Sequence, residues 1–142
     1  MKTVSQVLQS KAGGVLSITP GASVFEALKE MAARNVGALL VMEDGRLRGI
    51  LSERDYARKV ILLGKSSHDV AVRDIMSTQV LCVRPDSTVD ECLSLMSGNR
   101  VRHLPVVSGG EVIGVLSIGD LVKAVIEEQR DTIRHLEDYI YQ

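Results

Sequence analysis

The sequence predicts an α/β (α+β) fold made of two copies of one strand–helix–strand–strand–helix unit, followed by an extended C-terminal helix. Residues 15–61 align with residues 80–126 without a gap, at a constant offset of 65 positions. Helix caps and hairpin turns recur at matching places in both copies. Because the chain has only 142 residues, we expect the two repeats to share one core and to pack about a pseudo-two-fold axis.

Each repeat begins with a short alternating strand and continues into an amphipathic helix. The strands are expected at residues 15–19 and 80–84, and a proline ends each of them. A Ser or Thr with Glu three positions later then forms a capping-box pattern, and apolar residues follow at helical spacing. The first helices are therefore expected to begin after Ser23 and Thr88.

A β-hairpin follows the first helix in each repeat. Two apolar runs flank a dipeptide that accepts positive φ, which a tight hairpin turn needs. The turns are Asp44-Gly45, between residues 38–42 and 47–51, and Gly109-Gly110, between residues 104–107 and 112–116.

The second helix of the second repeat is much longer than its counterpart. The first copy is expected to be helical over residues 53–63 and to stop at Gly64, whereas the second runs from Ile118 towards the end of the chain. Its apolar pattern either folds back onto its own domain or meets another copy of the chain; we favour the second because a small core has little surface left to cover it. The pattern consists of Val122, Val125, Ile126, Gln129, Ile133, Leu136 and Ile140.

These elements divide the chain into three parts along its length. Residues 1–68 form the first repeat with its leading segment, residues 69–128 the second repeat, and residues 129–142 the helical extension. A short amphipathic segment leads into each repeat, at Val4–Leu8 and at Val72–Met76.

Composition excludes several classes of partner. Seventeen Lys and Arg stand against eighteen Asp and Glu, so no electrostatic footprint favours nucleic acid or an anionic membrane. The apolar stretches are strand-sized and the start lacks a signal-peptide core, so we expect a cytoplasmic, soluble protein. Cys82 and Cys92 occupy apolar positions and are expected in the core, and no His or Cys spacing suggests a metal site.

The polar residues shared by both repeats are Ser52 with Asp55 and Ser117 with Asp120. A Ser followed three residues later by an acid caps a helix, and spacing alone favours that reading. The first helices use Glu in this place while both second helices use Asp, which indicates a further role. A helix N-terminus with free N–H groups suits a phosphate, and a carboxylate one turn inward can accept hydrogen bonds from the vicinal hydroxyls of ribose.

The repeat order, the prolines, the segment 102–107 and the two Gly-h-h-Ser-x-x-Asp elements (h apolar) resemble a tandem pair of cystathionine β-synthase (CBS) domains, a Bateman module, over roughly residues 4–129. The resemblance implies a stand-alone regulatory protein that binds adenine nucleotides in two clefts between the repeats and forms a homodimer. AMP is the first candidate, and NAD(H), ADP, ATP and S-adenosylmethionine are others.

The resemblance also implies a role for each matching residue. Asp55 and Asp120 would hold the ribose of the two sites, and Ser52 and Ser117 would contact phosphate. Arg54 would add positive charge near the first phosphate. The base would lie against the remaining residues, mainly through main-chain groups: Ile18, Thr19, Pro20, Gly37, Ala38, Val83, Arg84, Arg102, His103, Leu104 and Pro105.

Two other function classes stay open beside the nucleotide sensor. An interaction or dimerisation scaffold with vestigial ligand clefts would keep the core and the turns, but it has no need for Asp in both motifs. Catalysis ranks third, because no Ser-His-acid or Cys-His arrangement is evident. Arg54 faces Gly119 in the alignment, and Arg102 and His103 face Gly37 and Ala38, so we expect the two sites to differ in affinity or ligand.

Overall fold

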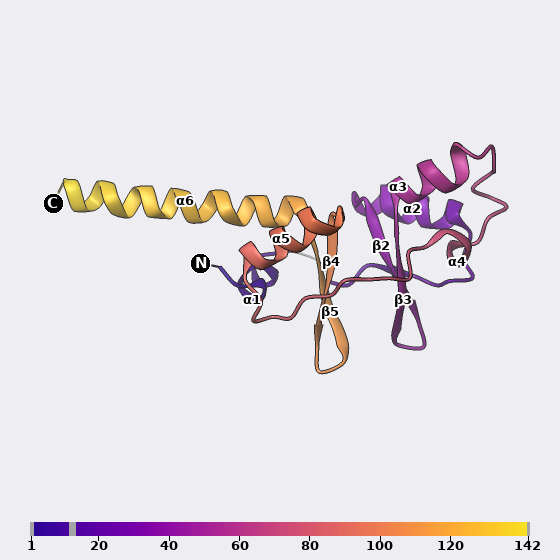
Figure 1. Ribbon diagram of the computed structural model, residues 1–142, viewed down its shortest axis with the longest axis horizontal. Helices are drawn as coiled ribbons and strands as arrows, with labels where there is room; N and C mark the ends of the chain where they lie inside the picture. The colour runs from indigo at the N-terminus through magenta and orange to yellow at the C-terminus, as the bar shows by residue number, and fades with distance from the viewer. Residues whose placement is uncertain (1, 12–13, 142) are drawn as a thin grey trace. The chain divides into compact units, whose positions relative to one another are not determined.

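The computed structural model describes residues 2–11 and 14–141. The chain divides into two compact units (Figure 1), which we call the central unit, Val15–Leu81, and the terminal unit, Met1–Gly14 with Cys82–Gln142. Each unit contains one hairpin and its helices, so each can be described by itself.

The central unit is a three-stranded sheet covered by helices. Strand β1 pairs in parallel with β2, and β2 pairs antiparallel with β3. Nine buried residues form its core: Val24, Ala27, Met31, Leu39, Val41, Leu51, Val60, Val72 and Ile75. Its elements are β1 (Ser17–Ile18), α2 (Val24–Arg34), β2 (Ala38–Glu43), β3 (Arg46–Ser52), α3 (Glu53–Tyr56), the π-helical η1 (Ala57–Ile61) and α4 (Val72–Ile75).

The terminal unit repeats this plan with a two-stranded sheet. Strand β4 pairs antiparallel with β5, and the place of β1 is taken by a single parallel bridge between Val83 and Val106. The core includes Val4, Val89, Met96, Leu104 and Leu121. The elements are α1 (Val4–Gln9), α5 (Val89–Asn99), β4 (His103–Ser108), β5 (Glu111–Ser117) and α6 (Ile118–Ile140).

The two leading helices are exchanged between the repeats. Helix α1 precedes the first repeat but packs in the terminal unit, where the Val4 N–H donates to the Ser87 carbonyl at 2.8 Å. Helix α4 precedes the second repeat but packs in the central unit, where the Val72 N–H donates to the Ala22 carbonyl at 2.8 Å. The compact units therefore differ from a division by order along the chain, such as 1–68 and 69–128.

The hairpins are confirmed, whereas the first strands are shorter than expected. Both turn dipeptides adopt positive φ: 51° and 75° at Asp44-Gly45, and 59° and 80° at Gly109-Gly110. Within the expected strands at residues 15–19 and 80–84, the described strand pairing joins Ser17 and Ile18 to β2 and Val83 to Val106. Cys82 is exposed, so its expected core position is wrong, because the neighbouring Val83 is the residue that turns inward.

Helix α6 continues without a break for 23 residues. Leu121 and Ala124 are buried against the terminal unit, and Val125 packs beside that core. From residue 129 to residue 141 every side chain is exposed, so this half does not fold back onto the terminal unit (Figure 1). Among the described residues, no helix is long and apolar enough to cross a bilayer.

Candidate functional site

In the central unit Ser52 and Asp55, the first copy of the duplicated pair, form a capping box at the first turn of α3. The Ser52 hydroxyl accepts from the Asp55 N–H at 3.2 Å, and Asp55 Oδ2 accepts from the Ser52 N–H at 2.9 Å and from its hydroxyl at 3.0 Å. The other carboxylate oxygen, Oδ1, lies 3.3 Å from Lys59 Nζ. The same ammonium donates to the Ile75 carbonyl at 2.8 Å. One carboxylate oxygen of Asp55 thus caps the helix, and the other forms an ion pair with Lys59.

The terminal unit builds the same cap with a different lysine. The Ser117 hydroxyl accepts from the Asp120 N–H at 3.1 Å, and Asp120 Oδ2 accepts from the Ser117 N–H at 2.8 Å. Lys11, which follows α1, donates to Asp120 Oδ2 at 2.8 Å and to the Val115 carbonyl at 2.6 Å. Asp120 Oδ1 has no hydrogen bond to any residue described in the structure. The capping-box prediction for both motifs is confirmed.

The first helices complete only half of the expected box. Ser23 and Thr88 accept from the N–H groups of Glu26 and Glu91, but no reciprocal bond from either Glu is present among the described residues. Main-chain carbonyls take over in this region, as where the Val24 N–H donates to the Val70 carbonyl at 2.8 Å. The two capping boxes in which both hydrogen bonds form are therefore those that use the shorter Asp, at Ser52 and Ser117.

The starts of β2 and β4 are brought to these motifs. Ala38 pairs with Ser52, and the Glu53 N–H donates to the Gly37 carbonyl at 3.0 Å. In the terminal unit His103 pairs with Ser117, and the Ile118 N–H donates to the Arg102 carbonyl at 2.9 Å. The first N–H group of each helix therefore already has a hydrogen-bond acceptor, whereas the sequence predicted free N–H groups there. In α6 the N–H groups of Ile118 and Asp120 already donate, to the Arg102 carbonyl and to the Ser117 hydroxyl.

Strand β1, and Val83 in the terminal unit, lie at the opposite end of each sheet from the Ser-x-x-Asp motif. Ile18 pairs with Val41, three residues along β2 from Ala38, which is a separation of about 10 Å along the strand. Thr19 and Pro20 follow in the direction away from Ala38, because β1 and β2 are parallel. A ligand held at Asp55 is therefore remote from these three residues of the same unit.

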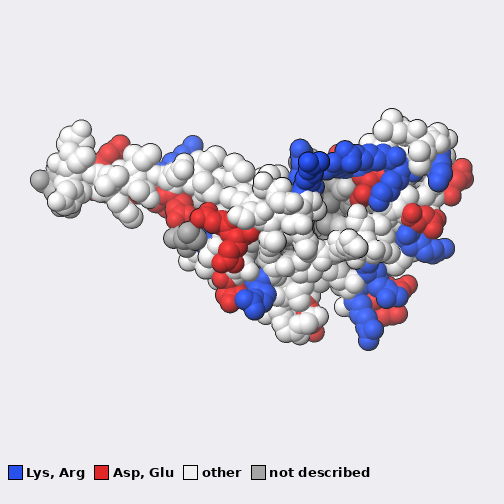
Figure 2. All heavy atoms as spheres, viewed as in Figure 1, with Lys and Arg blue, Asp and Glu red and all other residues white. Residues whose placement is uncertain are grey.

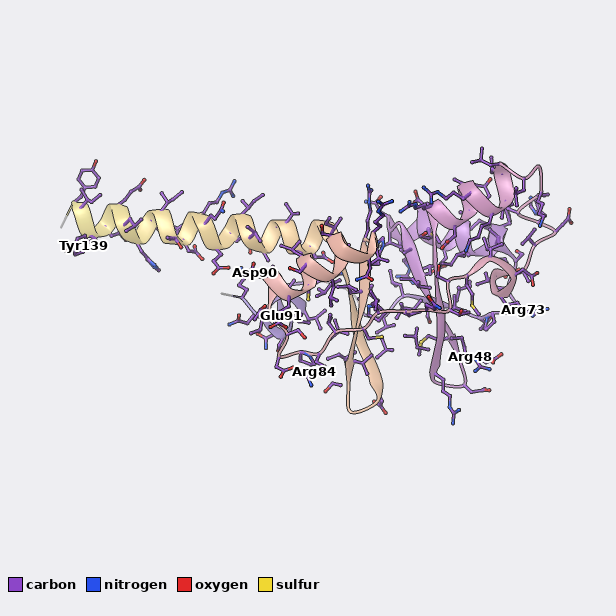
Figure 3. The ribbon with its side chains drawn as sticks, in the orientation of Figure 1. Arg48, Arg73, Arg84, Asp90, Glu91 and Tyr139 are labelled. Atoms are coloured by element: carbon purple, nitrogen blue, oxygen red, sulfur yellow. The ribbon has the colours of Figure 1, made fainter. Side chains whose placement is uncertain are left out.

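The corresponding residues of the terminal unit follow the same rule. Val83 pairs with Val106, three residues from His103. Arg84 (Figure 3) is exposed, and its guanidinium lies 3.4 Å from the Asp86 carboxylate. Leu104 and Pro105 are buried, and Val83 and Leu104 belong to the core. Those apolar side chains are committed to packing, and the Val83 N–H is already bonded to the Pro105 carbonyl.

Electrostatics distinguish the end of the terminal unit that carries Asp120. Burial lowers the pKa of His103, and the charges of Lys11 and Arg102 lower it further while Asp120 opposes them. Burial raises the pKa of Asp120, but hydrogen bonds from Lys11 and Ser117 outweigh this and hold that pKa below its usual value. At neutral pH the group therefore presents a neutral imidazole beside an ionised carboxylate.

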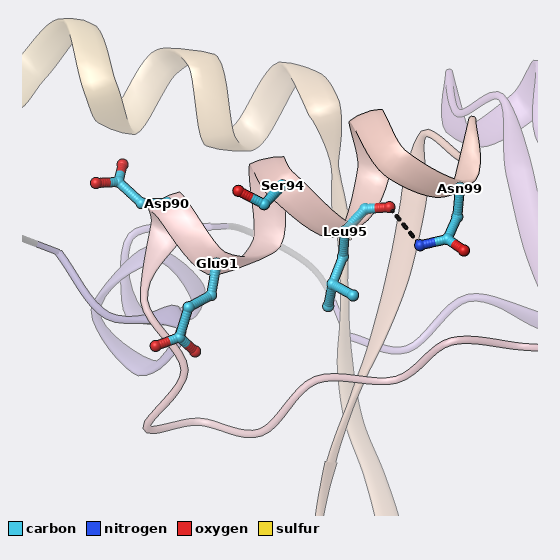
Figure 4. Close-up of a pocket in the computed structure, with 5 residues that line it drawn as sticks. All are labelled: Asp90, Glu91, Ser94, Leu95 and Asn99. Carbon is cyan, nitrogen blue, oxygen red and sulfur yellow. Dashed lines mark hydrogen bonds between the residues drawn. The ribbon is translucent and has the colours of Figure 1, made fainter.

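The described residues of the terminal unit line at least two hollows. One, of about 270 Å³, lies between α1 and α6; it is lined by Lys2, Val7, Ser10, Lys11, Asp120, Lys123, Ala124 and Glu127. The other, of about 590 Å³, lies along one side of α5 (Figure 4); it is lined by Asp90, Glu91, Ser94, Leu95 and Asn99. Only the first contains a residue that the sequence singled out.

Lys11 and Lys59 are the residues that sequence reasoning missed. Lys59 could have been found, because it stands four residues after Asp55 on the same helix. Lys11 could not, because it is 109 positions from Asp120 and reaches it only through the exchange of α1. The two motifs thus differ in the origin of their cation, as well as at Arg54 and His103.

Comparison with known proteins agrees with this architecture. The chain matches the CBS domain family over residues 4–61 and 72–127. It is 42% identical over 147 residues to a CBS domain-containing protein of Arabidopsis thaliana that is named as mitochondrial, covering 97% of this chain and 71% of the relative.

Solved structures are similar over most of the chain. A CBS domain structure with 53% identity has a TM-score of 0.85 and covers 88% of this chain and 98% of its own. The CBS domain pair of another protein, solved in complex with 5′-methylthioadenosine and S-adenosyl-L-methionine, has 22% identity and a TM-score of 0.79, with coverage of 90% and 98%. At that identity the likeness shows the fold alone. By its two family matches and its Arabidopsis relative, the chain belongs to the CBS domain family.

Proposed function

We propose that the chain is a regulatory module that binds adenine nucleotides, with AMP as the first candidate and ADP, ATP and NAD(H) as others. The observation that carries the proposal is the duplicated Ser-x-x-Asp at the start of α3 and α6. Both carboxylates are partly covered, with 15% and 24% of the side chain exposed at Asp55 and Asp120. Each lies at a fixed place where a ribose diol can replace the lysine contact.

The choice of an adenosine compound has a second support. In one protein of this fold, the CBS domain pair holds 5′-methylthioadenosine and S-adenosyl-L-methionine, and both ligands contain adenosine. The proposal for this chain adds that its motifs recognise the ribose. It also includes the predictions that the protein acts without catalysis, in the cytoplasm, as a homodimer.

The two sites are proposed to differ. At Asp120 a ligand must displace a lysine that comes from a separate segment and lies beside His103 and Arg102. At Asp55 the competing cation is Lys59 of the same helix, and Arg54 and Arg58 stand nearby in sequence. These differences in local charge and tethering give unequal affinities for a given nucleotide.

A thermal-shift and calorimetry panel of AMP, ADP, ATP, NADH and S-adenosylmethionine tests the proposal. At a hundredfold excess over its dissociation constant, a ligand stabilises the fold by about 2.7 kcal/mol. Asp55→Ala and Asp120→Ala should each remove one binding event. The 2′-deoxy nucleotides should bind more weakly than their ribose counterparts, because they lack one of the two hydroxyls.

The variants need a control, because each Asp also caps a helix. Ser23→Ala and Thr88→Ala remove the caps of α2 and α5 at a comparable cost of about 1 kcal/mol, yet they lie outside the two motifs. They should keep both binding events. If they lose binding as the Asp variants do, the Asp effect is one of stability and the ribose contact is excluded.

A scaffold with vestigial clefts is the second candidate. Its support is that Ser and Lys partners already occupy both carboxylate oxygens of Asp55 and one of those of Asp120. A chain that shows no response to any member of the panel, yet associates with itself or with a partner, would favour this function over the sensor.

A further inference from the structure

One face of α6 carries a stripe of apolar side chains that its own unit does not cover. Along this stripe, successive positions are separated alternately by four and three residues, as in a heptad repeat. Ile126, Ile133 and Ile140 occupy one core position of the heptad. Val122, Gln129 and Leu136 occupy the other. The exposed fractions are 42% at Ile126, 55% at Ile133 and 57% at Leu136. We call Val122, Ile126, Gln129, Ile133, Leu136 and Ile140 the α6 stripe.

The stripe is distinct from the face that α6 turns to the terminal unit. That inner face is made by Leu121 and Ala124, which are buried. The C-terminal half of the helix runs past its neighbours α1 and α5 (Figure 1), and Tyr139 projects from its last turn (Figure 3). In the space-filling view most of the surface of this half is uncharged (Figure 2). Such a row of exposed apolar residues is typical of an interaction surface.

We propose that the α6 stripe packs against the α6 stripe of a second copy of the chain, as an antiparallel coiled coil. This deepens the homodimer included in the proposed function by naming its surface and orientation. With Ile126 opposite Leu136 of the second copy, Ile133 falls opposite Gln129 and Val122 opposite Ile140. Every member of the stripe then has a partner, so the whole length from residue 122 to residue 140 is covered.

The charges beside the stripe select the antiparallel orientation. Lys123, Arg130 and Glu137 each follow a stripe residue and form one flank, which changes from basic to acidic along the helix. In an antiparallel pair, this flank of one helix faces the same flank of the other helix. Lys123 of each copy therefore meets Glu137 of the other copy, which gives two such pairs in each dimer. In a parallel pair the same flank would face Val125, Thr132 and Tyr139, which carry no charge.

One contact in this arrangement is unfavourable and gives a sharp test. Arg130 lies at the centre of the flank and meets Arg130 of the second copy across the two-fold axis. Arg130→Gln removes that repulsion and should strengthen the dimer. If the helices instead paired one heptad further apart, Arg130 would meet Glu137, and the same variant would weaken the dimer.

Analytical ultracentrifugation of the full chain without nucleotide tests the surface. Ile133→Asp or Leu136→Asp places a charge in the seam and should raise the dimer dissociation constant about 100-fold or more. The matched control is Ile113→Asp on β5, since Ile113 is 47% exposed and lies outside α6. A monomeric wild type, or equal behaviour of Ile133→Asp and the control, overturns the proposal. Because all three residues are exposed, circular dichroism should show unchanged folding.

A charge-reversal cycle tests the orientation. Lys123→Glu and Glu137→Lys should each weaken the dimer about tenfold, because every dimer carries the pair twice, and the double variant should restore it. The two residues are about 21 Å apart along one helix, so a coupling between them must act between chains. Absence of rescue overturns the antiparallel pairing. Since no nucleotide is present, failure here leaves ligand binding at Asp55 and Asp120 untouched, and failure of ligand binding leaves this assembly untouched.

Discussion

At the scale of single residues, the equivalent glycines Gly49 and Gly114 have different neighbours in the two repeats. A Cβ at Gly49 would lie 2.6 Å from the Ser77 carbonyl oxygen, which is backbone and cannot move aside. A Cβ at Gly114 would lie 2.7 Å from the end of the Leu8 side chain, which can change rotamer. We therefore expect Gly49→Ala to lower the free energy of unfolding by about 2–3 kcal/mol and Gly114→Ala by about 1 kcal/mol or less.

Urea denaturation of the two glycine variants measures this difference, and each serves as the control for the other. They add the same methyl group at equivalent hairpin positions, so propensity effects cancel. Equal losses of stability would mean that the close approach of the Ser77 carbonyl to β3 is not a constraint on the fold.

Asp120 makes the stability of the terminal unit depend on pH. Its pKa in the folded chain lies below the value of about 3.9 expected in the unfolded chain. Folding therefore favours the ionised carboxylate; this stabilisation is fully present above pH 4 and is lost as the pH falls through the folded pKa. Lys11→Met should move the pKa of Asp120 upward, as measured by carboxyl NMR titration.

Lys2→Met is the matched control for that titration. Lys2 lines the same hollow, but its ammonium pairs with Glu127 at 3.0 Å, so its loss should leave the pKa of Asp120 close to the wild-type value. If both lysine variants shift Asp120 equally, the effect is the general charge of the hollow and the direct hydrogen bond from Lys11 is unimportant.

At the scale of elements, the features that could be predicted from the sequence are those that short stretches of it determine. The caps at Ser52 and Ser117, the positive-φ turns and the long α6 were all expected, because each depends on neighbours within a few residues. The partner of Val4 could not be inferred, because a short amphipathic helix fits either unit equally well by pattern. The register of β1 could not be inferred for the same reason: short-range patterns do not say that Ile18 pairs with Val41, three residues along β2 from Ala38.

At the scale of the whole molecule, the exchange of α1 and α4 predicts which fragments fold. Residues 15–81 contain a complete core, including Val72 and Ile75. Residues 1–68 lack α4 and carry α1, whose Val4 and Val7 pack in the terminal unit. We expect the fragment 15–81 to unfold cooperatively on heating, and the fragment 1–68, although it holds a whole repeat by sequence, to lack a cooperative transition.

Circular dichroism and amide hydrogen exchange on the two fragments make this comparison, with Val72→Ala in the fragment 15–81 as its internal control. That variant should reproduce part of the defect of 1–68, at a cost of about 1–3 kcal/mol, because it leaves a cavity in the core at the position of α4. Cooperative unfolding of 1–68 would show that the repeat alone is the folding unit. The contribution of Val72 and Ile75 to the core of the central unit would then be a refinement of the fold and not a requirement for it.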